Sequence, residues 1–226
     1  MLAPPLLRPV AEHGLLVEFG ALMTPEVHER VLQLDAALTR QPFPGFAEAV
    51  PGSATLLVRF DPLVADHHSV GAHVLALLGA PFTAPQPRLH EMPVCYDAEL
   101  SPDLRDVAAA TGLSPDEVIA QHLAASFEVS MYGFAPGYAY LTGVPQAIRV
   151  PRKPAAIRDV PRGSVLIAGQ QCIVSTLTMP TGWSIIGRSP RRVLTGDADH
   201  PFLFEVGDRV RFTRITRAEF DWMEGA

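Results

Sequence analysis

Arg188 has the surroundings of a fixed anion-binding group. It follows Gly187 and precedes Ser189-Pro190, so a flexible backbone position is joined to a stiff one. Its planar guanidinium can donate paired hydrogen bonds to a carboxylate or a carboxyphosphate group. The alternative is that Arg188 forms an ion pair with a structural carboxylate such as Asp208. The sequence leaves both interpretations open.

Aromatic residues gather around a glycine-rich turn between residues 133 and 141. Gly133 and Gly137 flank Pro136, which predicts a tight turn between two strands. The nearby aromatic residues are Tyr132, Phe134, Tyr138 and Tyr140. In the functional interpretation, Phe134 and Tyr138 form the wall of a pocket for a small planar ligand, and main-chain groups of the turn, which contains Gly137, donate hydrogen bonds. In the alternative, the turn is a packed corner of a β-barrel.

Signatures of a self-sufficient catalyst are absent from the chain. There is no HExxH, GxSxG or CxxC motif. His67, His68 and His73 gather on one predicted helix, but no fourth ligand or carboxylate accompanies them. We therefore interpret them as solvated residues and predict no metal site.

The basic residues restrict amine and nucleotide chemistry. Of the 18 basic residues only Lys153 is a lysine, so a Schiff-base mechanism would depend on it alone. Lys153 lies in Arg152-Lys153-Pro154, which fits neither the phosphate-binding loop GxxxxGK[ST] nor a biotin site with its methionine neighbours. We expect no cofactor on this chain, and another chain to supply any ATP or biotin chemistry. The basic stretch from Arg149 to Arg162 is interpreted as a solvated face or a partner contact.

Composition indicates an ordinary globular protein of the cytoplasm. The chain has 226 residues, 48% of them hydrophobic and 19% charged, and a formal net charge of −6, which disfavours nucleic acid as a partner. No apolar run approaches the roughly 20 residues that cross a bilayer, and the N-terminal segment lacks the pattern of a secretory signal, so no membrane partner is expected. Cys95 and Cys172 are predicted to be two buried thiols, with a disulfide as the alternative.

Two regions with different hydrophobic periodicity meet at the proline-rich stretch from Ala80 to Pro87. Before it, a β–α–β–β–α–β order predicts a small split αβ sandwich over residues 1–84. Its helices are expected to begin at Thr24-Pro25 and near Asp66. After it, residues 88–226 carry a strand, two short helices and then short strands separated by glycine and proline, which predicts a closed β-barrel. The fold class is therefore α+β.

The ordered set of motifs resembles the family of the 5-oxoprolinase B subunit, also known as allophanate hydrolase subunit 1 or the kinase-inhibitor (KipI) type. The motifs that carry the resemblance are LLVEFG, TPEVHERVLQL, LLVRFDP, GLSPDEVIAQH, GFAPGYAYLTGVP, VPRGSVLIAG, PTGW, IIGRSP and GDRVRFTRI. They cover nearly the whole chain, and their order is more specific than any single motif. Departures from the usual pattern, at Gln170 and at Cys172-Ile173 among others, indicate a divergent paralogue.

The resemblance implies an αβ sandwich domain followed by a cyclophilin-like barrel. It implies partners as well: a homologous C-type subunit in a hetero-oligomer, and an A-type subunit with which the assembled complex uses ATP to open a small cyclic amide. Within that hypothesis, Arg188 and Gln171 would bind the polar groups of a lactam or urea-like substrate, beside Phe134 and Tyr138. His122 is a candidate proton carrier, with packing against the barrel as its alternative.

Two other functions remain open at this point. The KipI-type resemblance implies a regulatory module that inhibits a sensor histidine kinase. A prolyl isomerase rests on fold analogy alone.

Overall fold

The computed structural model describes residues 4–80 and 86–225. The chain divides into two compact units, residues 1–86 and 87–226. The central residues of the expected proline-rich linker, 81–85, lie outside the described residues.

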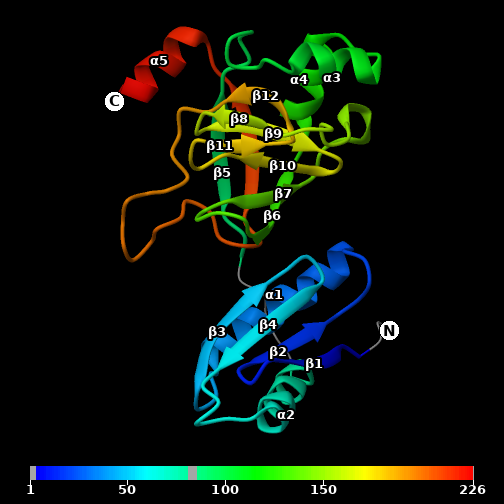
Figure 1. Ribbon diagram of the computed structural model, residues 1–226, viewed down its shortest axis with the longest axis vertical. Helices are drawn as coiled ribbons and strands as arrows, with labels where there is room; N and C mark the ends of the chain where they lie inside the picture. Colours follow the sequence, from blue (N-terminus) through cyan, green and yellow to red (C-terminus); the bar gives the residue numbers. More distant parts are fainter. Residues whose placement is uncertain (1–3, 81–85, 226) are drawn as a thin grey trace. The chain divides into compact units, whose positions relative to one another are not determined.

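The first unit is a two-layer sandwich of one antiparallel sheet and two helices (Figure 1). The sheet has the strand order β1-β2-β4-β3. Its strands are β1 (Leu6–Val10), β2 (Gly14–Glu18), β3 (Phe46–Pro51) and β4 (Thr55–Phe60). The helices are α1 (Pro25–Arg40) and α2 (His67–Leu78). Apolar side chains of both helices pack against β2 and β4 in one core, which includes Val17, Leu34, Leu56, Val58 and Val74.

Both helices begin where they were expected, and each has a side-chain cap. The Thr24 hydroxyl accepts a hydrogen bond from the Val27 amide at 3.3 Å, and the Asp66 carboxylate accepts one from the Ser69 amide at 2.8 Å. Such caps satisfy amides that lack a partner inside the helix. The element order is β–β–α–β–β–α rather than the expected β–α–β–β–α–β: β1 was not predicted, and the strand that follows α2, Leu89–Val94, belongs to the sheet of the second unit. Pro9 interrupts the pattern of β1 and is tolerated because β1 is an edge strand.

The second unit is built on a seven-stranded sheet with the order β12-β9-β10-β7-β6-β13-β5. Its strands are β5 (Leu89–Val94), β6 (Phe127–Tyr132), β7 (Ala139–Thr142), β9 (Ser164–Ala168), β10 (Gln171–Val174), β12 (Ser184–Arg188) and β13 (Arg209–Arg214). The segments at its two edges meet where the amides of Cys95 and Arg188 each donate to the carbonyl of the other at 2.9 Å. This bridge closes the sheet into a barrel and confirms the predicted α+β fold with its barrel.

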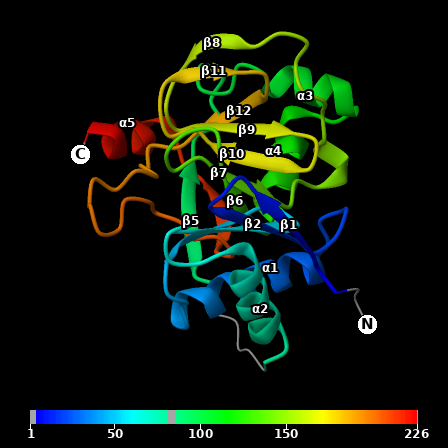
Figure 2. The same cartoon turned by 60° about the horizontal axis from the view of Figure 1, so that its bottom comes forward.

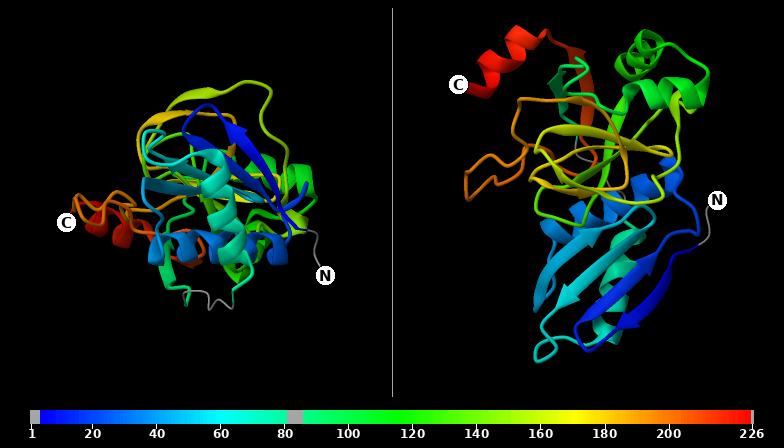
Figure 3. Two further views of the ribbon diagram at one scale, coloured as in Figure 1. Left: turned by 90° about the horizontal axis from the view of Figure 1, so that it is seen from below. Right: turned by 45° about the horizontal axis from the view of Figure 1, so that its top comes forward.

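Helices and a short ribbon surround the barrel sheet. The remaining elements are α3 (Leu104–Thr111), α4 (Pro115–Ala124), the short helix η1 (Gln146–Ile148), β8 (Ile157–Val160), β11 (Met179–Thr181) and α5 (Arg217–Gly225). Strands β8 and β11 pair in an antiparallel ribbon (Figure 2). Helices α3 and α4 lie together on one side of this unit, and α5 lies on the opposite side (Figure 3).

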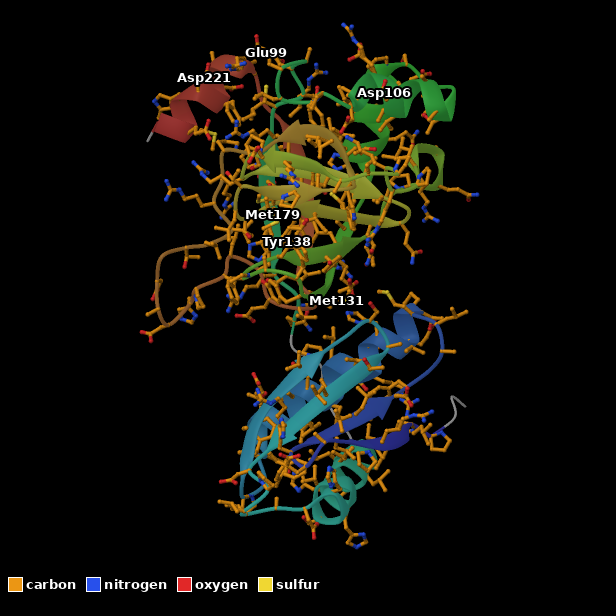
Figure 4. All side chains as sticks on the ribbon, viewed as in Figure 1. Glu99, Asp106, Met131, Tyr138, Met179 and Asp221 are labelled. Atoms are coloured by element: carbon orange, nitrogen blue, oxygen red, sulfur yellow. The ribbon has the colours of Figure 1, made fainter. Side chains whose placement is uncertain are left out.

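The barrel sheet is buried on both faces at β9. All five residues of this strand are buried, with Val165 and Ile167 in the main core and Leu166 and Ala168 in a second cluster. Tyr138 and Trp183 belong to that second cluster, and Met179 packs against it; Tyr138 and Met179 lie close together in Figure 4. The second cluster forms the base of the candidate site.

Cys95 and Cys172 are both buried free thiols, as predicted. None of the helices in the described ranges is long and apolar enough to span a membrane.

Candidate functional site

Phe134 and Tyr138 line one cleft of the second unit, with a volume of about 310 Å³. Its wall is a series of neighbouring aromatic rings. The ring centroids are 5.3 Å apart for Phe134 and Tyr138, 5.8 Å for Tyr138 and Tyr140, and 6.0 Å for Tyr140 and Trp183. These edge-to-face contacts hold the rings in place and present an apolar surface suited to a flat ligand.

The rim of the cleft carries an unusual backbone conformation. Phe134 has φ +73°, in the left-handed region that favours glycine, and its side chain is 73% exposed. A bulky residue rarely adopts this region, and such strain gathers at ligand-binding sites. Tyr138, by contrast, is buried, which raises the pKa of its hydroxyl to about 12, with the neighbouring Tyr140 adding to the rise and Arg152 opposing it. Tyr138 is therefore a neutral hydrogen-bond donor at physiological pH.

Arg152 supplies the positive charge of the cleft. Its guanidinium carbon lies 5.4 Å from the centroid of the Trp183 ring, within the range of a cation–π contact. Among the described residues, no carboxylate forms an ion pair with Arg152. The cleft thus combines an apolar aromatic wall with a cation that has no ion-pair partner among the described residues.

Lys153 fixes the segment that carries Arg152. Its ammonium donates to Oδ2 of Asp103 at 2.6 Å, and the same oxygen accepts the Ile185 amide at 2.7 Å. The Lys153 amide also donates to the Gly182 carbonyl at 2.6 Å, next to Trp183. Because its amine is committed to a half-buried ion pair, the single lysine acts as a structural clamp rather than as a nucleophile.

Arg188 lies outside the aromatic cleft. Its Nη2 donates to Oε1 of Glu224 at 3.1 Å, its Nε donates to the Arg162 carbonyl at 3.1 Å, and its guanidinium covers the Phe220 ring. The arginine is thus paired with a carboxylate, but the partner is Glu224 on α5. Asp208, the expected partner, instead accepts His90 Nε2 at 2.7 Å.

Gly137 and Gln171 are not among the residues that line the cleft, although Gly137 directly precedes Tyr138. A Cβ atom on Gly137 would lie 2.7 Å from Cδ2 of Leu194, so this glycine lets the turn approach the 194–202 loop. Gln171 opens β10 and pairs with Thr142 at the end of β7 opposite Tyr138. Thr142 is four residues further along the chain than Tyr138, so the backbones of Gln171 and Tyr138 are roughly 13 Å apart. The structure therefore brings together only Phe134 and Tyr138 of the predicted substrate-binding residues.

His122 is enclosed in the barrel core. It is fully buried, its Nδ1 lies 2.8 Å from the Tyr96 hydroxyl, and its ring packs on Phe212 with centroids 4.4 Å apart. Burial lowers its pKa to about 3, so the ring is neutral at pH 7. This is the packed arrangement that was the alternative for His122, and no opening in the described structure gives a ligand access to it.

The helical histidines are not assembled into a metal site within residues 4–80 and 86–225. His73 Nε2 contacts the Gln41 carbonyl at 2.9 Å, and His67 packs edge-on against Phe60. Both rings are used in local packing.

Sequence reasoning missed Arg152 and Trp183 as cleft residues. Arg152 was assigned to a solvated or partner-binding stretch, and Trp183 was noted only as part of a motif. The pairing of β11 with β8, together with the hydrogen bond from the Lys153 amide to the Gly182 carbonyl, brings the two residues together. Trp183 follows Gly182 between β11 and β12, and this position in a short turn was the signal that could have identified it as a cleft residue. Its neighbour Arg152 could not be identified in this way, because their contact depends on the register of the β8–β11 ribbon.

Known proteins are similar to this chain along nearly its whole length. Residues 5–204 match the family described as carboxyltransferase domain, subdomain C and D. The chain is 33% identical to the B subunit of 5-oxoprolinase from Bacillus subtilis, with 93% of each chain covered. It is 31% identical to the protein of the same name from Escherichia coli O157:H7, covering 90% of this chain and 93% of the relative.

Solved structures support the same grouping. TTHA0988 superposes with a TM-score of 0.80 at 34% identity, covering 93% of this chain and 40% of that longer chain. The urea carboxylase of Kluyveromyces lactis superposes with a TM-score of 0.74 at 18% identity over 98% of this chain and 23% of that chain, a likeness that shows the fold alone. The chain belongs to the family of the 5-oxoprolinase B subunit and has the fold of the carboxyltransferase C and D subdomains.

Proposed function

We propose that this chain is the B subunit of an ATP-dependent 5-oxoprolinase or a closely related amidolyase, and that its aromatic cleft binds the amide substrate. The names of its relatives support the first part. The second part rests on one observation: an aromatic wall lies beside Arg152, a cation without an ion-pair partner in the described chain.

The chemistry of 5-oxoproline matches this arrangement. Its lactam ring is small and nearly flat, and its carboxylate is ionised at neutral pH. The ring would lie against Tyr138, Tyr140 and Trp183, and the carboxylate would accept hydrogen bonds from Arg152. A charge-assisted bond of this kind contributes about 1.5–3 kcal/mol, less at an exposed arginine.

The cleft offers binding without a catalytic base. Its described lining contains no His, Cys, Lys, Asp or Glu side chain, and the Tyr138 hydroxyl stays protonated. Ring opening needs an activated carbonyl and a nucleophile, so we assign both, together with ATP, to the C-type and A-type partner subunits. The role of this chain is then to bind and orient the amide.

Reconstitution tests the proposal. The chain is combined with candidate C-type and A-type partners, and ATP hydrolysis is measured with 5-oxoproline, urea and allophanate. We expect amide-dependent ATP hydrolysis only when every member of the complex is present. Equal turnover by the partners without this chain, or none with any of the three amides, would overturn the assignment.

A charge-removing variant identifies the substrate class. Arg152→Gln should raise KM for 5-oxoproline or allophanate, which are anionic, by roughly five- to tenfold. It should leave KM for neutral urea nearly unchanged. Arg105→Gln, an exposed arginine on α3, is the matched control. Equal KM values for Arg152→Gln and the control would remove Arg152 from the substrate site.

A further inference from the structure

Three arginines surround a second concavity, on the side of the unit that carries α5. A pocket of about 650 Å³ is lined by Pro93, Arg162, Pro190, Arg191, Arg192, Met223 and Glu224. A smaller one of about 200 Å³ adjoins it and shares its three arginines. Neither pocket shares a lining residue with the aromatic cleft.

The charge of this concavity is positive although the chain carries a formal net charge of −6. Glu224 is the one acidic residue that lines either pocket in the described structure, and three arginines face it. Its carboxylate is already shared between Arg188, at 3.1 Å, and Arg162, at 3.5 Å. One carboxylate cannot neutralise the whole group, so a positive excess remains.

The excess charge lies on Arg191 and Arg192. Arg191 Nη1 donates to the Glu91 carbonyl at 2.8 Å, a neutral acceptor that orients the guanidinium without cancelling its charge. The Glu91 carboxylate itself pairs with Arg211. Arg192 is exposed and forms no ion pair or side-chain hydrogen bond with any residue in the described ranges.

The backbone that carries Arg162 is held rigidly. Gly163 has φ +78°, and a Cβ atom there would lie 2.2 Å from the Ser189 carbonyl oxygen, so the two segments touch. The Ser189 amide donates to the Gly163 carbonyl at 2.8 Å. Ser175 Oγ donates to the Pro161 carbonyl at 2.9 Å and accepts from the Ser164 amide at 3.0 Å. A fixed backbone reduces the conformational freedom that the chain loses when Arg162 binds an anion.

From this geometry we propose that the arginine pocket, formed by Arg162, Arg191 and Arg192, binds a phosphate-type dianion. Three guanidinium groups around one concavity suit a tetrahedral dianion, which offers more acceptor oxygens and more charge than a carboxylate. Glu224 occupies one side of the pocket and competes with the ligand for Arg162. The proposal does not depend on the amide substrate, because it concerns a separate site on the chain by itself.

The site is tested by titrating the full chain with inorganic phosphate in an otherwise phosphate-free buffer and measuring the heat of binding by calorimetry. We expect Arg192→Gln to weaken phosphate binding by about five- to tenfold. Glu224→Gln, which keeps the side-chain volume and removes the competing charge, should strengthen it by about threefold or more. Arg105→Gln is the matched control and should bind like the wild type.

The two variants are expected to change phosphate affinity in opposite directions, which distinguishes a defined site from nonspecific attraction of phosphate to a positive surface. Absence of phosphate binding, or equal changes in Arg192→Gln and Arg105→Gln, would overturn the proposal. Weaker binding by Glu224→Gln at an unchanged melting temperature would also overturn it, since that result makes Glu224 a helper and not a competitor. Acetyl phosphate and ATP in parallel titrations identify the source: tighter binding than phosphate points to the phosphoryl group of a larger molecule, and equal or weaker binding points to free phosphate. A failure to bind phosphate would not change the result expected from the reconstituted amidolyase assay.

Discussion

Acidification from pH 7 to pH 5 should weaken the second unit through His122. The folded-state pKa of this histidine is about 3, because burial disfavours the charged ring, whereas an unfolded histidine has a pKa of about 6.5. Between these values the unfolded chain binds a proton that the folded chain does not. The contribution to stability is therefore complete above pH 6.5 and is lost as the pH falls towards 3.

The magnitude follows from the distance between pH 5 and the unfolded pKa. That distance is about 1.5 pH units, and each unit corresponds to about 1.4 kcal/mol, so His122 should account for a loss of about 2 kcal/mol at pH 5. Asp35 in the first unit works in the opposite direction. Burial raises its pKa to about 6, so its protonated form is favoured in the folded state and stability increases by about 1.4 kcal/mol as the pH falls from 7 to 5.

The two contributions can be separated by probe and by variant. Both tryptophans, Trp183 and Trp222, lie in the second unit, so tryptophan fluorescence during urea unfolding follows the unit that contains His122. Far-UV circular dichroism follows both units. His122→Asn retains a polar group near Nδ1 for the Tyr96 hydroxyl but cannot titrate, and Asp35→Asn removes the opposing carboxyl.

We expect His122→Asn to be less stable at both pH values because it leaves a cavity. The decisive quantity is the difference between pH 7 and pH 5, which should shrink by about 2 kcal/mol relative to the wild type. In Asp35→Asn, the decrease in the free energy of unfolding between pH 7 and pH 5, followed by circular dichroism, should be larger than in the wild type. An equal pH dependence for wild type and His122→Asn would refute the assignment of a neutral buried histidine.

Three further predictions concern positions that hold the barrel together. Arg188→Lys should lower the free energy of unfolding by about 1–2 kcal/mol by losing guanidinium hydrogen bonds and packing; a loss of activity in the assembled complex at unchanged stability would instead favour a ligand-binding role. Asp103→Ala should cost about 2–4 kcal/mol because it leaves Lys153 unpaired in a half-buried position, and the additional replacement of Lys153 by Met should recover part of this loss; no recovery in urea unfolding would contradict the coupling. Gly163→Ala should cost about 2–4 kcal/mol, because its backbone is left-handed and the new methyl group would meet the Ser189 carbonyl; a melting temperature equal to that of the wild type would refute this packing.

Local signals in the sequence predicted the element boundaries well. The helix starts at Thr24 and near Asp66 were found because a cap is decided by residues close together in the sequence. The same signal was available for α5, where the Thr216 hydroxyl and the Glu219 carboxylate exchange hydrogen bonds with each other's amides, but it was overlooked. Strand β1 was missed because edge pairing, and not local pattern, stabilises it.

The composition of the site could not be predicted to the same extent. Phe134 and Tyr138 were identified together because a single turn places them side by side. For Arg188, an ion pair with a structural carboxylate such as Asp208 was only the alternative interpretation, and its carboxylate partner is Glu224 on the C-terminal helix, 36 residues further along the chain. Such pairs depend on barrel closure and on the docking of α5, which no local pattern encodes.

The distribution of reactive groups supports the division of labour proposed for this family member. Three groups that could act as a base or a nucleophile are unavailable in the described structure: His122 and Cys172 are fully buried, and Lys153 is bound to Asp103. Burial also raises the pKa of Cys172, which keeps its thiol protonated. The aromatic cleft and the arginine pocket carry instead aromatic rings and arginines, which bind and orient ligands without exchanging protons at neutral pH. In the division of labour that we propose, this chain recognises an amide and an anion, and a partner supplies the groups for the bond-breaking step.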